Sequence, residues 1–134
     1  MIGELITRIE RRGLKLVGIK LISIDVNLAQ KHYDAHSDKP FFDGLVDFIT
    51  SGPVVAMVWS GENAVSIVRS TMGSTDPVES NPGTVRGDLA MSIGQNLIHG
   101  SDSEETAEHE INLFFTSNEL VDYNRSIDSW TTGS

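Results

Sequence analysis

The sequence contains no cysteine among its 134 residues, which excludes disulfide bonds and thiolate metal sites. It also has no uninterrupted run of about 18 apolar residues, the length that a helix needs to span a bilayer. The first residues lack the apolar segment of a secretory signal peptide. From these absences we expect a protein that works in the cytoplasm and does not bind membranes.

Positive charge is scarce beyond the first third of the chain. No lysine follows Lys39, and the later basic side chains are Arg69, Arg86 and Arg125. The formal net charge is −9, and residues 101–134 carry eight acidic side chains against one arginine. An acidic surface repels phosphate backbones, so nucleic-acid binding is not expected. Any phosphate site must use a few well-placed arginines, which directs attention to Arg69 and Arg86.

The length and composition favour a single soluble domain over residues 1–134. Hydrophobic residues make up 39% of the chain and charged residues 22%, as in ordinary globular proteins. Apolar spacing and turn residues divide the chain into elements. They predict helices at 2–9, 27–35, 41–49, 62–72 and 102–115, strands at 14–24 and 53–59, a loop at 75–87, a core segment at 89–98 and an irregular tail from 119.

Residues 96–103, NLIHGSDS, place His99 between an apolar run and a helix start. We expect Gly100 to form a tight turn, and Ser101 with Glu104 to form a capping box. Backbone N–H groups at such a junction suit an anion, and Glu110, two turns into the helix, is in reach to orient the imidazole. The alternative is that His99 is a hydrogen-bonded structural residue, which is the commoner case for a lone histidine.

The other histidines give weaker signals. His32 and His36 are four residues apart, a spacing that suits a metal pair, but no third ligand follows in a recognisable pattern. We therefore do not expect a histidine metal site. His109 lies in a charged helix, where we expect it to be solvated. The sequence has no Walker A motif and no G-x-G-x-x-G junction, so P-loop and Rossmann nucleotide binding are not indicated.

Several strings together resemble one enzyme family. NLIHGSDS, followed by Glu110 and Ile111, resembles the active-site signature of the nucleoside diphosphate kinases. KPFFDGLVDFITSGPVVAMVW at 39–59, GSTDP at 73–77, NPGTVRGDL at 81–89 and ELVDY at 119–123 resemble further segments of that family, in the same order. The resemblance covers nearly the whole chain.

The resemblance implies roles for individual residues. His99 matches the nucleophile that is phosphorylated, while Glu110, Ser101 and Tyr33 match groups that orient it and handle protons. The nucleotide-binding positions of the family correspond to Phe41 for the base, Asn96 for the ribose, and Arg69, Thr75 and Arg86 for the phosphates. It also implies Mg²⁺ bridging the nucleotide phosphates, with Asp102 near the water shell of the metal.

The resemblance further implies an α+β fold, a ferredoxin-like βαββαβ sandwich with an antiparallel sheet. In the family, a strand with a phosphate-binding lysine precedes the first helix, whereas Met1 here falls at that helix. We therefore expect the first strand to be absent from an N-terminally truncated chain. The resemblance also implies a homo-oligomer built from dimers, and the C-terminal segment favours a hexamer.

The leading functional hypothesis is γ-phosphate transfer from a nucleoside triphosphate to a nucleoside diphosphate. The resemblance implies a ping-pong mechanism through a phosphohistidine at His99. The alternative is a non-catalytic nucleotide-binding or assembly module that has lost turnover together with the first strand.

Overall fold

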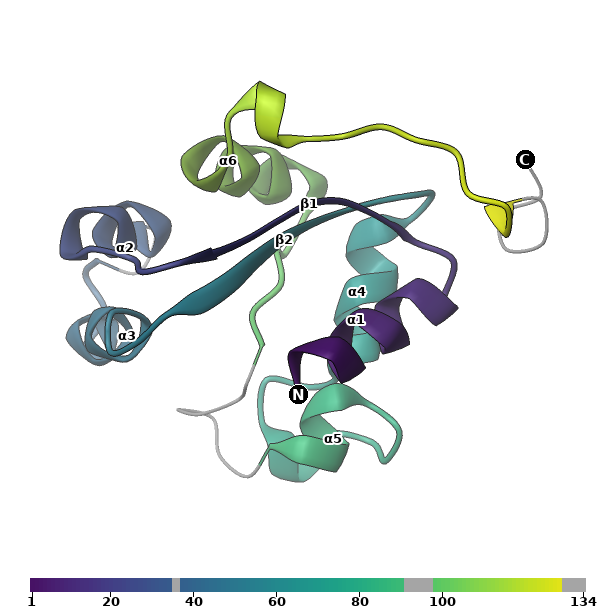
Figure 1. The fold of residues 1–134 in the computed structure, drawn as a ribbon. Helices are drawn as coiled ribbons and strands as arrows, with labels where there is room; N and C mark the ends of the chain where they lie inside the picture. The colour runs from purple at the N-terminus through teal and green to yellow at the C-terminus, as the bar shows by residue number, and fades with distance from the viewer. Residues whose placement is uncertain (35–36, 91–97, 129–134) are drawn as a thin grey trace.

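A computed structural model of the chain describes residues 1–34, 37–90 and 98–128. It combines helices with an antiparallel sheet, as the sequence predicts. No helix in these ranges is both long and apolar enough to cross a membrane. In chain order, the elements are α1 (Ile2–Arg11), β1 (Lys15–Ile22), α2 (Val26–His32), α3 (Phe42–Ile49), β2 (Val54–Ser60), α4 (Ala64–Met72), η2 (Pro77–Glu79), α5 (Val85–Leu89), α6 (Glu104–Phe114) and η3 (Ser117–Glu119) (Figure 1).

Strands β1 and β2 pair antiparallel, from Lys15 opposite Ser60 to Ile22 opposite Val54. The register is interrupted between Leu16 and Gly18. Gly18 is required for a close approach, because a Cβ atom there would lie 2.9 Å from the side chain of Leu120. The chain that follows α6 therefore packs directly on β1, as Figure 1 also shows.

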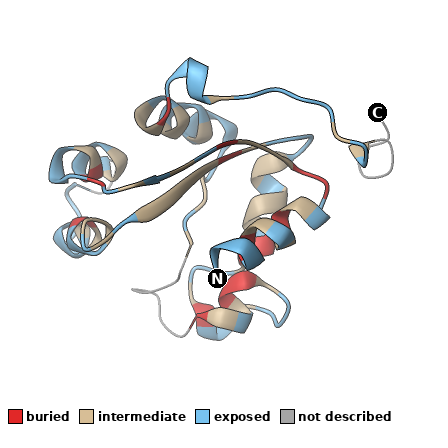
Figure 2. Ribbon diagram, viewed as in Figure 1, coloured by how far each residue is buried: buried red, intermediate tan, exposed pale blue. Residues whose placement is uncertain are grey.

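One part of the core lies at the end of the sheet where α2 and α3 pack (Figures 1 and 2). Its buried residues are Ile24, Ala29 and Val46, and Phe42 and Phe114 pack against them. Val46 and Phe42 lie on the apolar face that the spacing of residues 41–49 predicts. Phe114 brings α6 to the same cluster, so the helix after His99 is anchored beside α2.

Many of the other buried residues belong to α1, α4 and α5, which pack together away from α2 and α3 (Figure 1). Ile9, Met72 and Val85 are each no more than 2% exposed. An ion pair adds to this packing: Arg8 Nη1 of α1 lies 2.9 Å from Asp88 Oδ2 of α5. The backbone N–H of Gly83 also donates to Asp88 Oδ1 at 2.9 Å. These contacts tie the loop before α5 to the first helix.

Three local predictions were wrong. The last long helix begins at Glu104, and its capping box joins Ser103 with Thr106, because the Ser101 hydroxyl is hydrogen-bonded to Glu110 instead. Leu89, predicted to begin a core segment, ends α5, because the Thr84 hydroxyl caps a one-turn helix there. The segment predicted as loop therefore contains η2 and most of α5. Residues 91–97 of the predicted core segment lie outside the described residues.

The Asp88 contacts predict an acid-sensitive part of the stability. The hydrogen bond from Gly83 and that from Arg8 hold the pKa of Asp88 below its usual value. A lowered pKa stabilises the fold above the unfolded pKa, and this stabilisation is lost as the pH falls through the folded pKa. We expect Asp88→Asn to be less stable than the parent at neutral pH, with the difference closing below about pH 4.

Urea unfolding followed at several pH values measures this difference. Asp43→Asn, at an exposed position in the first turn of α3, is the control for loss of one carboxylate. A stability difference between Asp88→Asn and the parent that stayed constant with pH would contradict the prediction.

Candidate functional site

The main chain on both sides of His99 is held by arginine side chains. The carbonyl of Ile98 accepts a hydrogen bond from Arg86 Nη2 at 2.7 Å. The carbonyl of Gly100 accepts one from Arg69 Nη1 at 3.2 Å. Arg69 comes from the last turn of α4 and Arg86 from α5, so two helices position a segment that has no regular structure of its own.

Gly100 is needed for close packing rather than for a turn. Glycine is favoured where the φ angle is positive, but the φ angle of Gly100 is not positive. A Cβ atom at this position would instead lie 2.5 Å from the sulfur of Met72, and Met72 is 1% exposed. The sequence pointed to Gly100, but the expectation that it forms a tight turn was wrong.

The carboxylate of Glu110 faces the imidazole of His99. Glu110 Oε2 lies 3.4 Å from His99 Nε2, and the His99 side chain is 49% exposed. Burial raises the pKa of Glu110, but the hydrogen bond and charge of His99, the charge of His32 and a hydrogen bond from Ser101 outweigh it, so the pKa is lower than usual. Glu110 is therefore ionised at neutral pH. Three of the predicted catalytic residues, His99, Ser101 and Glu110, lie together.

His32 lies behind His99 and was not expected at this site. The two rings meet edge to face, with centroids 4.9 Å apart, and His32 Nδ1 lies 3.9 Å from Glu110 Oε2. Only 4% of the His32 side chain is exposed. Burial, followed by the charge of His99, lowers the pKa of His32 to about 4, so this imidazole is neutral at pH 7. Its position beside Tyr33 was the one signal in the sequence that pointed to it.

Tyr33, the fourth predicted catalytic residue, follows α2 and packs on His32. The two ring centroids are 4.5 Å apart, and the Tyr33 centroid lies 6.4 Å from that of His99. Burial and the charge of Glu110 raise the pKa of Tyr33, so its hydroxyl keeps its proton at neutral pH. Tyr33 is thus part of the aromatic surroundings of His99.

The two predicted phosphate-binding arginines differ in their surroundings. Arg86 is 5% exposed, and its Nη1 donates to the carbonyls of Gly73 and Ser74 at 3.4 and 3.3 Å. Burial lowers the pKa of Arg86, and the nearby charge of Arg69 adds to this effect. The Arg69 side chain is 40% exposed and lies 2.8 Å from Asp102 Oδ1.

Three of the remaining predicted ligands lie within the described residues. Thr75 is exposed and directly follows Ser74. Phe41 is 52% exposed and precedes α3. The Asp102 side chain is 75% exposed beside Arg69. Asn96 lies outside the described residues.

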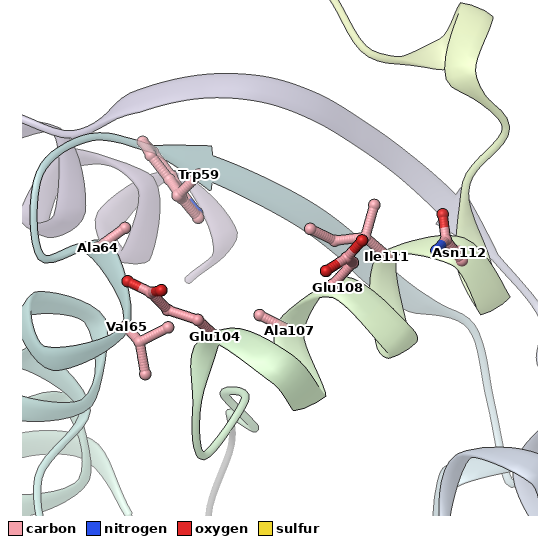
Figure 3. A pocket seen from close by; sticks show the side chains of 8 residues that line it. All are labelled: Trp59, Ala64, Val65, Glu104, Ala107, Glu108, Ile111 and Asn112. Carbon is pink, nitrogen blue, oxygen red and sulfur yellow. The ribbon is translucent and has the colours of Figure 1, made fainter.

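A shallow hollow of about 280 Å³ lies on another face of α6 (Figure 3). Trp59 of β2 and Val65 of α4 face Ala107 and Ile111 of α6 across it. None of the predicted site residues lines this hollow. This hollow is therefore separate from the cluster around His99.

Comparison with known proteins gives a consistent answer. The family model described as "Nucleoside diphosphate kinase" matches residues 1–120. The chain belongs to the nucleoside diphosphate kinase family. A nucleoside diphosphate kinase of Prochlorococcus marinus (strain NATL1A) is 57% identical over 130 residues, which are 97% of this chain and 86% of the relative. That of Haloarcula marismortui is 58% identical over 132 residues, or 97% and 86% of the two chains.

The structure of a halophilic nucleoside diphosphate kinase from Halobacterium salinarum in complex with CDP superposes with a TM-score of 0.94. It is 55% identical, and the match covers 97% of this chain and 87% of that one. The family and the α+β ferredoxin-like fold predicted from the sequence are thus confirmed. The chain is an enzyme of the nucleoside diphosphate kinase type, which transfers phosphate between nucleotides.

The contact between Gly100 and Met72 predicts a sensitive position in this kinase. We expect Gly100→Ala to lower the free energy of unfolding by about 1–3 kcal/mol, because an added methyl group overpacks a buried contact. The displaced segment carries His99, so kinase activity should fall even where the protein is fully folded. Urea unfolding and an activity assay measure the two effects.

Gly44→Ala is the matched control, since nothing lies within 4 Å of a Cβ atom there. Gly44 is inside α3, so the same substitution should stabilise by about 0.5–1 kcal/mol. Equal behaviour of the two variants would refute the packing role of Gly100.

Proposed function

We propose that this kinase transfers the γ-phosphate of a nucleoside triphosphate to a nucleoside diphosphate through a phosphohistidine at His99. One observation carries the proposal. The half-exposed imidazole of His99 is hydrogen-bonded through Nε2 to the ionised carboxylate of Glu110. Arg69 and Arg86 hold the backbone on either side of His99 in place. A neutral imidazole carries one N–H. With Nε2–H donating to Glu110, the lone pair is on Nδ1, which acts as the nucleophile.

In the first half-reaction, Nδ1 of His99 forms a bond to the γ-phosphorus. The bond from that phosphorus to the β,γ-bridging oxygen breaks, and the nucleoside diphosphate leaves with the bonding electrons. The imidazole becomes positively charged as the bond forms. Glu110 stabilises this charge across the Nε2–H hydrogen bond, and Ser101 holds the carboxylate in position. Tyr33 and His32 keep the rear of the ring from solvent.

In the second half-reaction, a terminal phosphate oxygen of an acceptor nucleoside diphosphate attacks the same phosphorus. The nitrogen–phosphorus bond breaks, its electrons return to Nδ1, and His99 is regenerated. Because donor and acceptor use one site in turn, the kinetics are ping-pong. The complex of the Halobacterium salinarum relative with CDP supports a nucleoside diphosphate as a ligand of this site.

Nucleotide binding is proposed at the positions that match the family. Arg69 exchanges Asp102 for phosphate oxygens, with Thr75 beside it, while Arg86 contributes its charge and fixes the His99 segment. Phe41 stacks on the base and Asn96 contacts the ribose. Stacking is tolerant of base identity, so several nucleosides should serve.

Members of this family generally use a divalent cation, and we propose that here it is Mg²⁺. Mg²⁺ prefers oxygen ligands and commonly binds through substrate phosphates with one or two carboxylates. Asp102 fits this pattern, because its carboxylate is largely exposed next to Arg69. Asp102 would face the water shell of the metal, and the cation would neutralise charge on the transferred phosphate.

We propose that the enzyme is cytoplasmic and assembles as a homo-oligomer built from dimers. The expected assembly is a hexamer. Ile19 and Leu21 of β1 are 48% and 70% exposed, and Val26 and Phe48 of α2 and α3 are 53% and 48% exposed. Large apolar side chains gathered on adjacent elements favour contact with another subunit. Light scattering of the purified chain measures the number of subunits.

The nucleophile is tested by brief incubation with γ-labelled ATP and Mg²⁺. We expect acid-labile, base-stable label on the parent and on His109→Ala, which removes an exposed histidine of α6. His99→Ala should carry no label and should lose turnover by at least about 10³-fold, as for loss of a covalent nucleophile. Label on a folded His99→Ala would refute the mechanism. Nucleotide binding without label on the parent would favour the non-catalytic module.

The roles of the two arginines predict different defects. Arg69→Ala should raise the KM for nucleotide and leave the fold intact, because its partners, Gly100 and Asp102, remain accessible to water. Arg86→Ala should also lower stability by about 1–3 kcal/mol, because it removes a side chain that is only 5% exposed together with its hydrogen bonds to three part-buried carbonyls. Kinetics combined with urea unfolding separate the two effects. The assignment fails if Arg86→Ala unfolds at the same urea concentration as Arg69→Ala.

A further inference from the structure

His32, His99 and Glu110 form a cluster in which one potential metal-ligating atom from each lies within 4.8 Å of the other two. Glu110 Oε2 is 3.4 Å from His99 Nε2 and 3.9 Å from His32 Nδ1. The three side chains come from α2, from the segment before α6 and from α6 itself. No pattern along the sequence joins them.

The spacing of these atoms approaches that around a tetrahedral metal ion, and side-chain shifts of up to about 1 Å would close it. Zn²⁺ binds histidine nitrogen and carboxylate oxygen at about 2.0–2.2 Å, which places neighbouring ligand atoms about 3.3–3.6 Å apart. The separation between Glu110 and His99 already fits, and that between Glu110 and His32 exceeds it by a few tenths of an ångström. Two histidines and one glutamate, with a fourth position open to water, are a donor set that Zn²⁺ accepts.

The state of His32 is the second, independent observation. Its side chain is only 4% exposed, yet Nδ1 is buried without a hydrogen-bond partner among the described residues. Buried polar atoms are nearly always paired, and an unpaired one needs an explanation. This nitrogen lies on the side of the ring that meets Glu110, where a bound cation would satisfy it.

We propose that His32, His99 and Glu110 bind Zn²⁺, and that the bound ion blocks phosphorylation of His99. The ion takes the lone pairs of His32 Nδ1, His99 Nε2 and a Glu110 oxygen, and a water molecule completes the coordination. The net charge of −9 favours accumulation of cations near the protein. Mg²⁺ would not compete, because it prefers oxygen ligands to imidazole.

The block follows from the proton balance of one imidazole ring. In the metal-free enzyme, the proton of His99 is on Nε2 and the lone pair on Nδ1. When Zn²⁺ takes Nε2, the neutral ring carries its proton on Nδ1. Nδ1 then has no lone pair with which to attack phosphorus. The ion also withdraws Glu110 from its hydrogen bond to His99. This inhibitory step rests on the proposed function, whereas binding of the ion does not.

The binding test uses the full chain without nucleotide and needs no activity assay. Isothermal titration with ZnCl₂ should give one strong site per subunit, retained in excess MgCl₂. His32→Gln should weaken it at least about tenfold, since one of three protein ligands is lost. His109→Gln removes an exposed imidazole from the same helix as Glu110 and should leave the affinity unchanged. Equal affinity of His32→Gln and the parent would overturn the proposal.

A spectroscopic measurement on the unmodified chain covers the case in which His32→Gln does not fold. Co²⁺ should give the intense visible bands of a four-coordinate site, and ZnCl₂ should abolish them. Only the weak bands of a six-coordinate ion would overturn the proposal. Zinc binding by a chain that never incorporates label from γ-labelled ATP would leave the metal site established and refute the proposed function instead. Labelling that resists stoichiometric Zn²⁺ would refute the block.

Discussion

The hydrogen bonds from Arg86 and Arg69 to the carbonyls on either side of His99 are the constraint on which the site depends. The segment at 98–103 has no regular secondary structure, so its own backbone hydrogen bonds cannot fix it. The helices α4 and α5 fix it instead, and Met72 of α4 leaves room there only for a glycine at position 100. Group transfer loses rate steeply when reacting atoms are misplaced by about an ångström. Anchoring the proposed nucleophile, His99, on both sides would meet that requirement without a strand or helix.

The electrostatic pattern around His99 follows from which groups are buried. Glu110 stays ionised because histidine and serine contacts outweigh its burial. His32 stays neutral because its ring has almost no access to water. A protonated His32 would place a second positive charge beside the His99 imidazole, which becomes positive in the proposed reaction. A neutral, packed His32 ring would support the proposed nucleophile without opposing that charge.

Local patterns in the sequence predicted most helices and strands, but they predicted the contacts between distant residues only in part. The apolar spacing of residues 2–9 and 41–49 corresponds to α1 and α3, because an amphipathic face is repeated within one helix. His32 was set aside for lack of a third ligand, since its neighbours, His99 and Glu110, are more than 60 positions away. The structural use of Arg86 and the packing of Gly100 on Met72 were also beyond sequence reasoning. Family resemblance supplied the proposed roles of the site residues, which no spacing encodes.

The burial of the two arginines separates tasks that the sequence assigned to both. Arg86 is 5% exposed and donates hydrogen bonds to the carbonyls of Gly73, Ser74 and Ile98, so any movement toward a ligand would break these bonds. Arg69 is partly exposed, and its carboxylate partner Asp102 is more exposed still. An ion pair in contact with water contributes little net stability, so exchange of Asp102 for a phosphate oxygen costs little. In the proposed mechanism, Arg86 therefore stays in place while Arg69 exchanges Asp102 for phosphate, and both are hydrogen-bonded to the segment that carries His99.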